Sequence, residues 1–171
     1  ITSQLFMIPM SLAIALTIRI GTYYGEQNWI AMRKVQWIGL ATGTVLAFMT
    51  MLLLWFFKNQ IVALYTSDVV VTQIAVYLVL FAIAYQIMDA WQISAAGCLR
   101  GMQDTKGPMW ITMIAYWIIA FPVGLYLSRF TDMGPAGVWI GLIVGLSIAC
   151  VLLLTRLYMN NKRLESQTKL F

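Results

Sequence analysis

Long apolar stretches separated by short polar connections dominate the pattern of this sequence. A helix that crosses a lipid bilayer needs about 20 mainly apolar residues. Five stretches of the chain reach that length, and few charged residues interrupt them. We therefore predict five transmembrane helices and a polar tail: spans at about 5–24, 37–57, 71–99, 108–127 and 137–158, with the tail at 159–171.

The composition supports lipid as the solvent of this chain. Of its 171 residues, 61% are hydrophobic and only 10% are charged, whereas soluble domains have about 45–50% and about 25%. A soluble fold of this length leaves too much surface outside to hide so many apolar side chains. The composition thus excludes a water-soluble enzyme and predicts an all-α, multi-pass membrane bundle. The chain contains no histidine, which excludes imidazole bases and His-based metal sites.

The eleven basic residues divide unequally between the two sides that five alternating spans define. Only Lys58 and Arg129 fall on one side, and the other nine fall on the opposite side. Because the connections are short, the positive-inside rule places the nine in the cytoplasm together with the C-terminal tail. The net charge of +5 therefore indicates topology, and no nucleic-acid partner is expected. The nine are Arg19, Arg33, Lys34, Arg100, Lys106, Arg156, Lys162, Arg163 and Lys169.

Small residues and prolines predict how the helices pack and bend. Gly137, Gly141 and Gly145 recur at four-residue spacing, which favours close helix contact in lipid. Pro9 and Pro122 lie within predicted spans and are expected to kink them. Such prolines are commonly structural, and the functional alternative is a bend that moves during transport.

Asp89 is the only one of the six acids inside a predicted span. A charged acid near the bilayer centre costs about 2.5–3.5 kcal/mol on insertion scales, so it must be solvated, paired or protonated. Tyr85, Gln86 and Gln92 lie three or four residues away and share its side of the helix. Such an acid can exchange a proton for a cation, as an ion-coupled antiporter requires. The alternative is a packing acid bonded to a neighbouring helix.

Three aromatic residues lie deep in the predicted spans: Trp91, Tyr116 and Trp117. Their ring faces could line a cavity for flat organic cations. Aromatic side chains at helical spacing are also typical of ordinary packing, so both interpretations stay open here.

Several motifs in order resemble the multidrug and toxic compound extrusion (MATE) family, in its bacterial NorM-type branch. The segment 9–21 (PMSLAIALTIRIG) is similar to a signature helix of that family. The segment 85–92 (YQIMDAWQ), with the glycines that follow it, resembles a second such stretch. The segments 116–124 and 134–141 resemble parts of the last two helices of the family.

The resemblance implies a fold of twelve helices in two six-helix lobes, of which these five spans would be helices eight to twelve. The chain begins with Ile1 inside an apolar stretch, so we expect it to be a piece of a longer polypeptide whose first seven helices are its missing partner. Family members lie in the bacterial inner membrane among its lipids. They export cationic amphipathic drugs in exchange for Na⁺ or H⁺.

The resemblance also implies a site. NorM-type members bind the coupling cation through an aspartate and a tyrosine one turn earlier, which correspond to Asp89 and Tyr85. A further acid on the seventh helix completes that site and is not in this chain. Apart from Na⁺ at Asp89, the resemblance implies no metal, and no cofactor beyond the coupling ion.

Other classes remain as alternatives. A lipid-linked oligosaccharide flippase of the same superfamily would need a cationic cavity, and no central Lys or Arg is seen. A non-transporting membrane assembly subunit would tolerate the loss of Asp89. A membrane enzyme is disfavoured because no constellation of nucleophile and base is visible.

Overall fold

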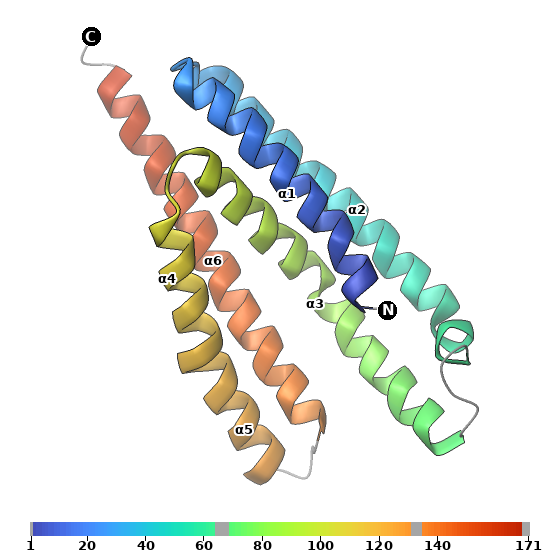
Figure 1. The fold of residues 1–171 in the computed structure, drawn as a ribbon. Helices are drawn as coiled ribbons and strands as arrows, with labels where there is room; N and C mark the ends of the chain where they lie inside the picture. Colours follow the sequence, from blue (N-terminus) through green and yellow to red (C-terminus); the bar gives the residue numbers. More distant parts are fainter. Residues whose placement is uncertain (1, 64–68, 131–134, 169–171) are drawn as a thin grey trace.

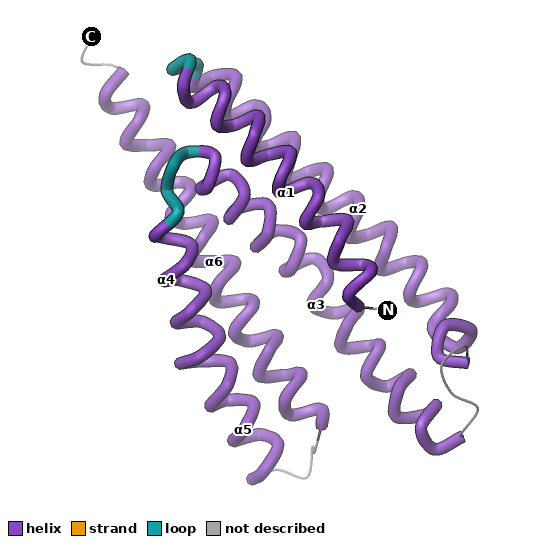
Figure 2. Tube along the Cα trace, in the orientation of Figure 1, coloured by secondary structure: helices purple, strands orange, loops and turns teal. Residues whose placement is uncertain are grey.

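The computed structural model describes residues 2–63, 69–130 and 135–168, which form a bundle of long helices (Figures 1 and 2). Within these ranges all the regular structure is helical, which confirms the all-α prediction. The helices α4, η1 and α5 follow one another without a break and form one continuous helical segment, which we call the α4–α5 rod. The elements are α1 (Thr2–Gly25), α2 (Trp29–Ala63), α3 (Val69–Gly101), α4 (Lys106–Met113), the π-helix η1 (Ile114–Ala120), α5 (Phe121–Phe130) and α6 (Pro135–Thr168).

Helix α3 is the centre of the bundle. It packs against α1 and α2 on one side and against α6 on the other, while η1 and α5 pack against α6. Figure 1 shows this arrangement, with α1 and α2 paired beside α3 and the α4–α5 rod paired with α6. A polar side chain on α3 can therefore meet residues from several other helices.

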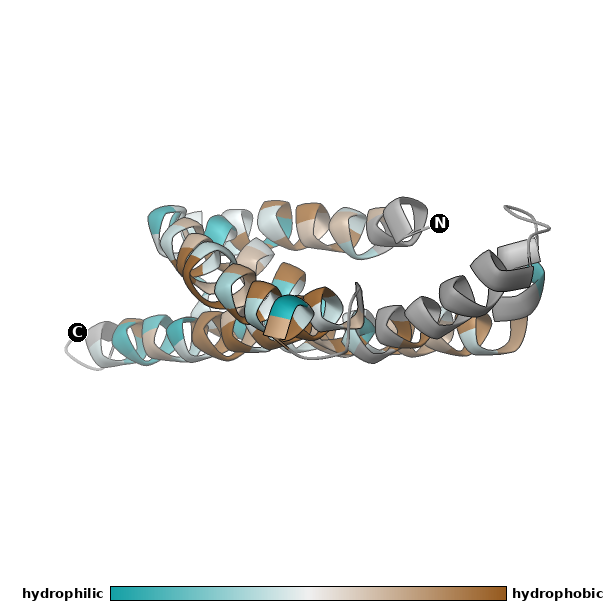
Figure 3. Ribbon diagram, turned by 90° about the horizontal axis from the view of Figure 1, so that it is seen from below, coloured by the Kyte–Doolittle hydropathy of each residue, from teal (hydrophilic) through white to brown (hydrophobic). Residues whose placement is uncertain are grey.

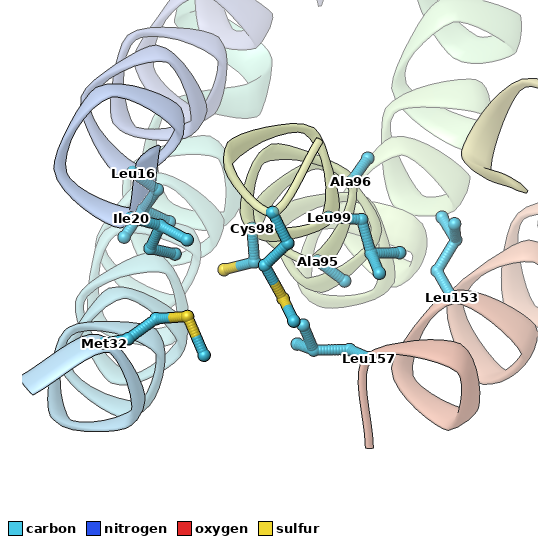
Figure 4. Packing of buried hydrophobic residues seen from close by; sticks show 10 residues of the cluster. Leu16, Ile20, Met32, Ala95, Ala96, Cys98, Leu99, Leu153 and Leu157 are labelled. Carbon is cyan, nitrogen blue, oxygen red and sulfur yellow. The ribbon is translucent and has the colours of Figure 1, made fainter. Parts of the chain in front are cut away.

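Apolar side chains from four helices form the main core (Figure 4). Ile20 of α1, Met32 of α2, Leu99 of α3 and Leu153 of α6 are all fully buried there. Cys98 joins the same cluster as a free thiol and acts as a small hydrophobic residue. This core holds the C-terminal part of α3 in place.

Close backbone contact at small residues holds the helices together. A methyl group added at Gly97 of α3 would lie 2.7 Å from the carbonyl oxygen of Ala13 in α1. One added at Gly141 of α6 would lie 2.5 Å from the Cα of Gly124 in α5. Both distances are far below ordinary contact. The predicted glycine series on α6 is therefore the surface that packs against η1 and α5, as association in lipid favours.

Three helical stretches within the described residues are long and apolar enough to cross a membrane: Trp29–Phe57, Lys106–Phe130 and Ala136–Ser166. They contain the predicted spans 37–57, 108–127 and 137–158. The predicted spans 5–24 and 71–99 lie within α1 and α3, and their crossing of the membrane stays a prediction. Figure 3 shows hydrophobic residues along the middle of α6 and hydrophilic ones toward its C-terminal end.

The π-helix η1 ends just before Pro122. The N–H of Phe121 donates to the carbonyl of Tyr116, five residues earlier, which is the wider π pattern. Proline lacks an N–H and its ring crowds the preceding turn, so a wider turn at this point relieves the contact. The helix thus contains a π-helical stretch just before Pro122, and the kink predicted there stays a prediction. Pro9 lies buried within α1, which is helical on both sides of it, and a kink there stays a prediction.

The first part of the predicted polar tail continues α6 as a helix as far as Thr168. Arg33 at the start of α2 forms an ion pair with Glu165 in this segment. Gln36 and Asn161 exchange hydrogen bonds at 2.8 and 3.3 Å. These polar contacts join α2 to the end of α6.

Candidate functional site

The Asp89 side chain lies on α3 and is only 8% exposed. Within the part of the chain that the structure describes, its carboxylate has no hydrogen-bond donor and no ion-pair partner. Buried charges in proteins are normally paired or hydrogen-bonded, because leaving water is costly for an ion. The carboxylate of Asp89 therefore lacks, among these residues, the cation that an ionised state requires.

Two tyrosines lie close enough to Asp89 to interact with its charge, Tyr85 and Tyr116. Tyr85 precedes Asp89 by one helical turn, and its ring stacks on that of Trp139 in α6 with centroids 6.1 Å apart. Tyr116 reaches across from η1, and its hydroxyl donates to the side-chain oxygen of Gln92 at 2.9 Å. We call Asp89, Tyr85, Gln92 and Tyr116 the Asp89 cluster.

Gln86 and Trp91 point away from the Asp89 cluster, toward α2. The Gln86 amide donates to the hydroxyl of Thr50 at 3.0 Å, and the Trp91 indole donates to that of Thr44 at 2.7 Å. Trp91 follows Asp89 by two positions, which is about 200° around an α-helix. Gln86 and Trp91, both predicted to line a cavity, thus form hydrogen bonds that join α3 to α2.

Trp117 also lies outside the Asp89 cluster. Its side chain is 70% exposed and contacts the ring of Phe121 on the outer surface of the rod. It directly follows Tyr116, so the two side chains point in different directions. The structure therefore places Tyr116 beside Asp89 and directs Trp117 outward.

The Asp89 cluster has one carboxylate and several neutral oxygen atoms. The described residues contain no group of three or more His, Cys, Asp or Glu side chains close enough to hold a metal ion together. One negative charge with neutral oxygens matches one proton or one monovalent cation. Within the Asp89 cluster, the neutral groups on the same helix as Asp89 are the phenol of Tyr85 and the amide of Gln92.

Asp104, in the turn between α3 and α4, differs from Asp89 because its carboxylate has several hydrogen-bond donors. Its carboxylate accepts hydrogen bonds from the Arg156 guanidinium, the Asn160 amide at 3.0 Å and the backbone N–H of Gly107 at 3.2 Å. These bonds, that of Arg156 first, hold the pKa of Asp104 below its usual value. Asp104 is thus a structural acid that is ionised at neutral pH, which separates its role from that of Asp89.

The sequence profile of the MatE family matches residues 1–126 of the chain. The chain belongs to the MATE family. Its NorM-type relatives support this assignment: a probable multidrug resistance protein NorM of Acinetobacter baylyi is 71% identical over 168 residues, which is 98% of this chain. The multidrug resistance protein NorM of Photobacterium profundum is 43% identical over 91% of the chain.

Solved MATE structures have the same arrangement of helices. The crystal structure of the eukaryotic MATE transporter AtDTX14 matches 97% of this chain with a TM-score of 0.86 at 22% identity. A MATE structure in the straight conformation matches 96% with a TM-score of 0.87 at 16% identity. The resemblance seen in the sequence and the membrane bundle it implied are therefore confirmed.

This MATE chain spans just over a third of the length of the relatives it matches, 37% of the Acinetobacter protein and 35% of the Photobacterium protein. Those relatives are named as multidrug resistance proteins and not as enzymes, which agrees with the prediction of a non-enzymatic membrane protein.

Sequence reasoning named all four members of the Asp89 cluster as candidates but missed other partners of its residues. Trp139 near the start of α6 has the position of an interfacial anchor in the sequence, yet it stacks on Tyr85. Thr44 and Thr50 give no signal in the sequence, since hydroxyls are common in membrane helices. Only the packing of α2 and α6 on α3 reveals these partners.

Proposed function

We propose that this chain is the C-terminal part of a multidrug efflux antiporter that exports cationic amphipathic drugs in exchange for Na⁺ or H⁺. Asp89 binds the coupling ion in this proposal, and the hydroxyl of Tyr85 assists it. The transporter lies in the bacterial inner membrane with its C-terminus in the cytoplasm. The orientation follows from the unequal distribution of the basic residues.

The buried carboxylate of Asp89 carries the proposal. It is 8% exposed and has no cation partner within the described residues. A carboxylate in that position is stable when a proton or a cation binds to it, and intramembrane ionisable residues are by default functional. Asp104 shows the contrast, because Arg156 already neutralises it.

Coupling requires that Asp89 hold the ion in one conformation and release it in another. In the conformation described here, Tyr85 is held against Trp139 of α6, and Gln92 is held by Tyr116 of η1. Both neighbours of Asp89 are therefore tied to elements other than α3. A shift of α6 or η1 relative to α3 would change the oxygen atoms around Asp89 and with them its affinity for the ion.

The test uses a chimera in which these 171 residues replace the matching segment of the Acinetobacter relative, so that a whole transporter is examined. Ethidium accumulation is measured in cells that express the chimera, Asp89→Asn, Asp89→Glu or Tyr85→Phe. We expect Asp89→Asn to accumulate ethidium as vector-only cells do. We expect partial efflux from Asp89→Glu, which keeps a carboxyl group, and from Tyr85→Phe, which keeps the ring on Trp139.

Tyr116→Phe is the matched control for Tyr85→Phe. It removes a tyrosine hydroxyl in the same cluster whose bond is to Gln92. Equal surface expression of all variants is verified by immunoblot of membranes. Undiminished efflux by Asp89→Asn would refute the coupling role of Asp89. A Tyr116→Phe defect equal to that of Tyr85→Phe would refute a specific role of the Tyr85 hydroxyl.

A further inference from the structure

A groove with a volume of about 670 Å³ lies between α2 and α6. Leu40 of α2 and Leu154 and Leu157 of α6 line its walls, and Trp91 of α3 contributes to its base. Asp89 is not among its lining residues, and Trp91 points to the opposite side of α3. The groove is therefore separate from the Asp89 cluster. We call it the α2–α6 groove.

One end of the α2–α6 groove is polar and carries a net positive charge. Arg33, Lys162 and Glu165 line this end. Glu165 is already engaged by Arg33, whereas Lys162 makes no ion pair within the described residues. The remaining positive charge disfavours a cationic drug in the groove and favours an anion.

Two aromatic side chains lie along the groove near its polar end. Trp37 is 72% exposed and Tyr158 is 68% exposed, and both line the groove. Trp and Tyr prefer the headgroup level of a bilayer, because one part of the side chain is apolar and another is polar. Trp37 and Tyr158 lie one turn inward from Arg33 and Lys162 along their helices, so the polar end of the groove fits the membrane interface.

We propose that the α2–α6 groove binds an anionic phospholipid of the bilayer. Its phosphate lies at Lys162 and Arg33, its glycerol region lies between Trp37 and Tyr158, and an acyl chain follows the leucines toward Trp91. Basic residues at the end of membrane helices attract anionic headgroups, and the apolar walls exclude a free phosphate from most of the groove. Under the orientation proposed above, this lipid belongs to the cytoplasmic leaflet.

Lipid retention tests the proposal. The purified full-length chimera is equilibrated with equal amounts of phosphatidylglycerol and phosphatidylcholine, and bound lipid is counted by native mass spectrometry. Lys162→Gln removes a groove cation that makes no ion pair within the described part of the chain. Its control Arg163→Gln removes an adjacent exposed charge that does not line the groove. Ala41→Phe fills the groove, and its control Val45→Phe places a ring on an exposed position of α2 outside it.

We expect the wild-type chimera to retain phosphatidylglycerol in preference, and both groove variants to lose at least half of that retention while both controls keep it. Equal retention of the two lipids, or equal losses in the groove variants and their controls, would overturn the proposal.

A photo-crosslinker identifies the occupant directly. Trp37→p-benzoylphenylalanine in the chimera, irradiated in native membranes, is expected to gain the mass of one anionic phospholipid. A crosslink to another segment of the transporter would show that protein covers the groove and would overturn the proposal. A crosslink to ethidium alone, supplied in excess, would show a drug site and would overturn it as well.

Discussion

The Nε atom of Arg156 lies 2.6 Å from Oδ2 of Asp104, which joins α6 to the turn between α3 and α4. A second guanidinium nitrogen lies 3.0 Å from Oδ1, so the contact has two hydrogen bonds. Asn160, one turn further along α6, donates to the same carboxylate. This corner of the bundle is held by polar contacts, in contrast to the neighbouring apolar core, which includes Leu99 of α3 and Leu153 of α6.

Asp104→Asn is expected to destabilise the protein at neutral pH. The Arg156 side chain is 43% exposed, so solvent weakens the pair and we expect a loss of about 1 kcal/mol. Because the pKa of Asp104 is lowered in the folded state, its stabilisation is present above the unfolded pKa of about 3.9 and is lost as the pH falls through the folded value. The apparent melting temperature of the chimera is measured from pH 7 down to pH 3.

The difference in melting temperature between wild type and Asp104→Asn should therefore be largest near pH 7 and should shrink below about pH 4. Glu26→Gln, in the exposed turn between α1 and α2, is the control and should change little at any pH. A difference that grows as the pH falls would contradict this account of Asp104.

Gly107→Ala is also expected to break the ion pair between Asp104 and Arg156, by displacing the Arg156 side chain. A methyl group at Gly107 would collide with the guanidinium of Arg156 while that group is held by Asp104. Because both substitutions remove one interaction, the double variant with Asp104→Asn should melt at nearly the same temperature as the less stable single variant. Additive losses in this double-mutant cycle would show that Gly107 acts independently of the ion pair.

Gly141→Ala is expected to separate α6 from α5. Its methyl group would lie 2.5 Å from both the Cα and the N of Gly124, which are backbone atoms that cannot move alone. Overpacking of this kind costs about 1–3 kcal/mol. Gly25→Ala is the matched control, because a methyl group there meets nothing within 4 Å. Equal melting temperatures for the two variants would refute close packing at Gly141.

Single-cysteine labelling tests the orientation. Lys34 and Arg129 are both exposed and lie at opposite ends of the helices that carry them, while the native Cys98 and Cys150 are buried. In intact cells, with the outer membrane permeabilised, a membrane-impermeant maleimide should label the chimera with Arg129→Cys. The chimera with Lys34→Cys should be labelled only after the inner membrane is opened. The reverse pattern would contradict the orientation inferred from the basic residues.

The helical bundle was predictable because its determinants are local. Runs of about 20 apolar residues specify membrane helices without reference to the rest of the chain. The glycine spacing on α6 likewise predicts a packing surface, and Gly141 does contact Gly124 closely. Asp89 was predictable as a candidate because placing a charged acid in a membrane helix costs free energy, however that helix packs.

The bonds that the residues around Asp89 form were not predictable, because they depend on how the helices pack. Helical spacing groups Gln86 with Asp89, yet Gln86 is bonded to Thr50 of α2. Neighbouring residues also diverge: Tyr116 faces the Asp89 cluster, whereas Trp117 faces outward. Helical spacing predicts which residues share one face of a helix. Which of those residues form a site depends on the helices that pack against that face.

Transport by the purified chimera in proteoliposomes is the decisive measurement of ion coupling at Asp89. Ethidium movement is measured while an inward gradient of Na⁺ or of H⁺ is imposed, for wild type and Asp89→Asn. We expect one of these gradients to drive ethidium exchange by the wild-type chimera, and Asp89→Asn to show no response to that gradient while remaining folded. A gradient-driven rate in Asp89→Asn equal to that of the wild type would contradict this expectation.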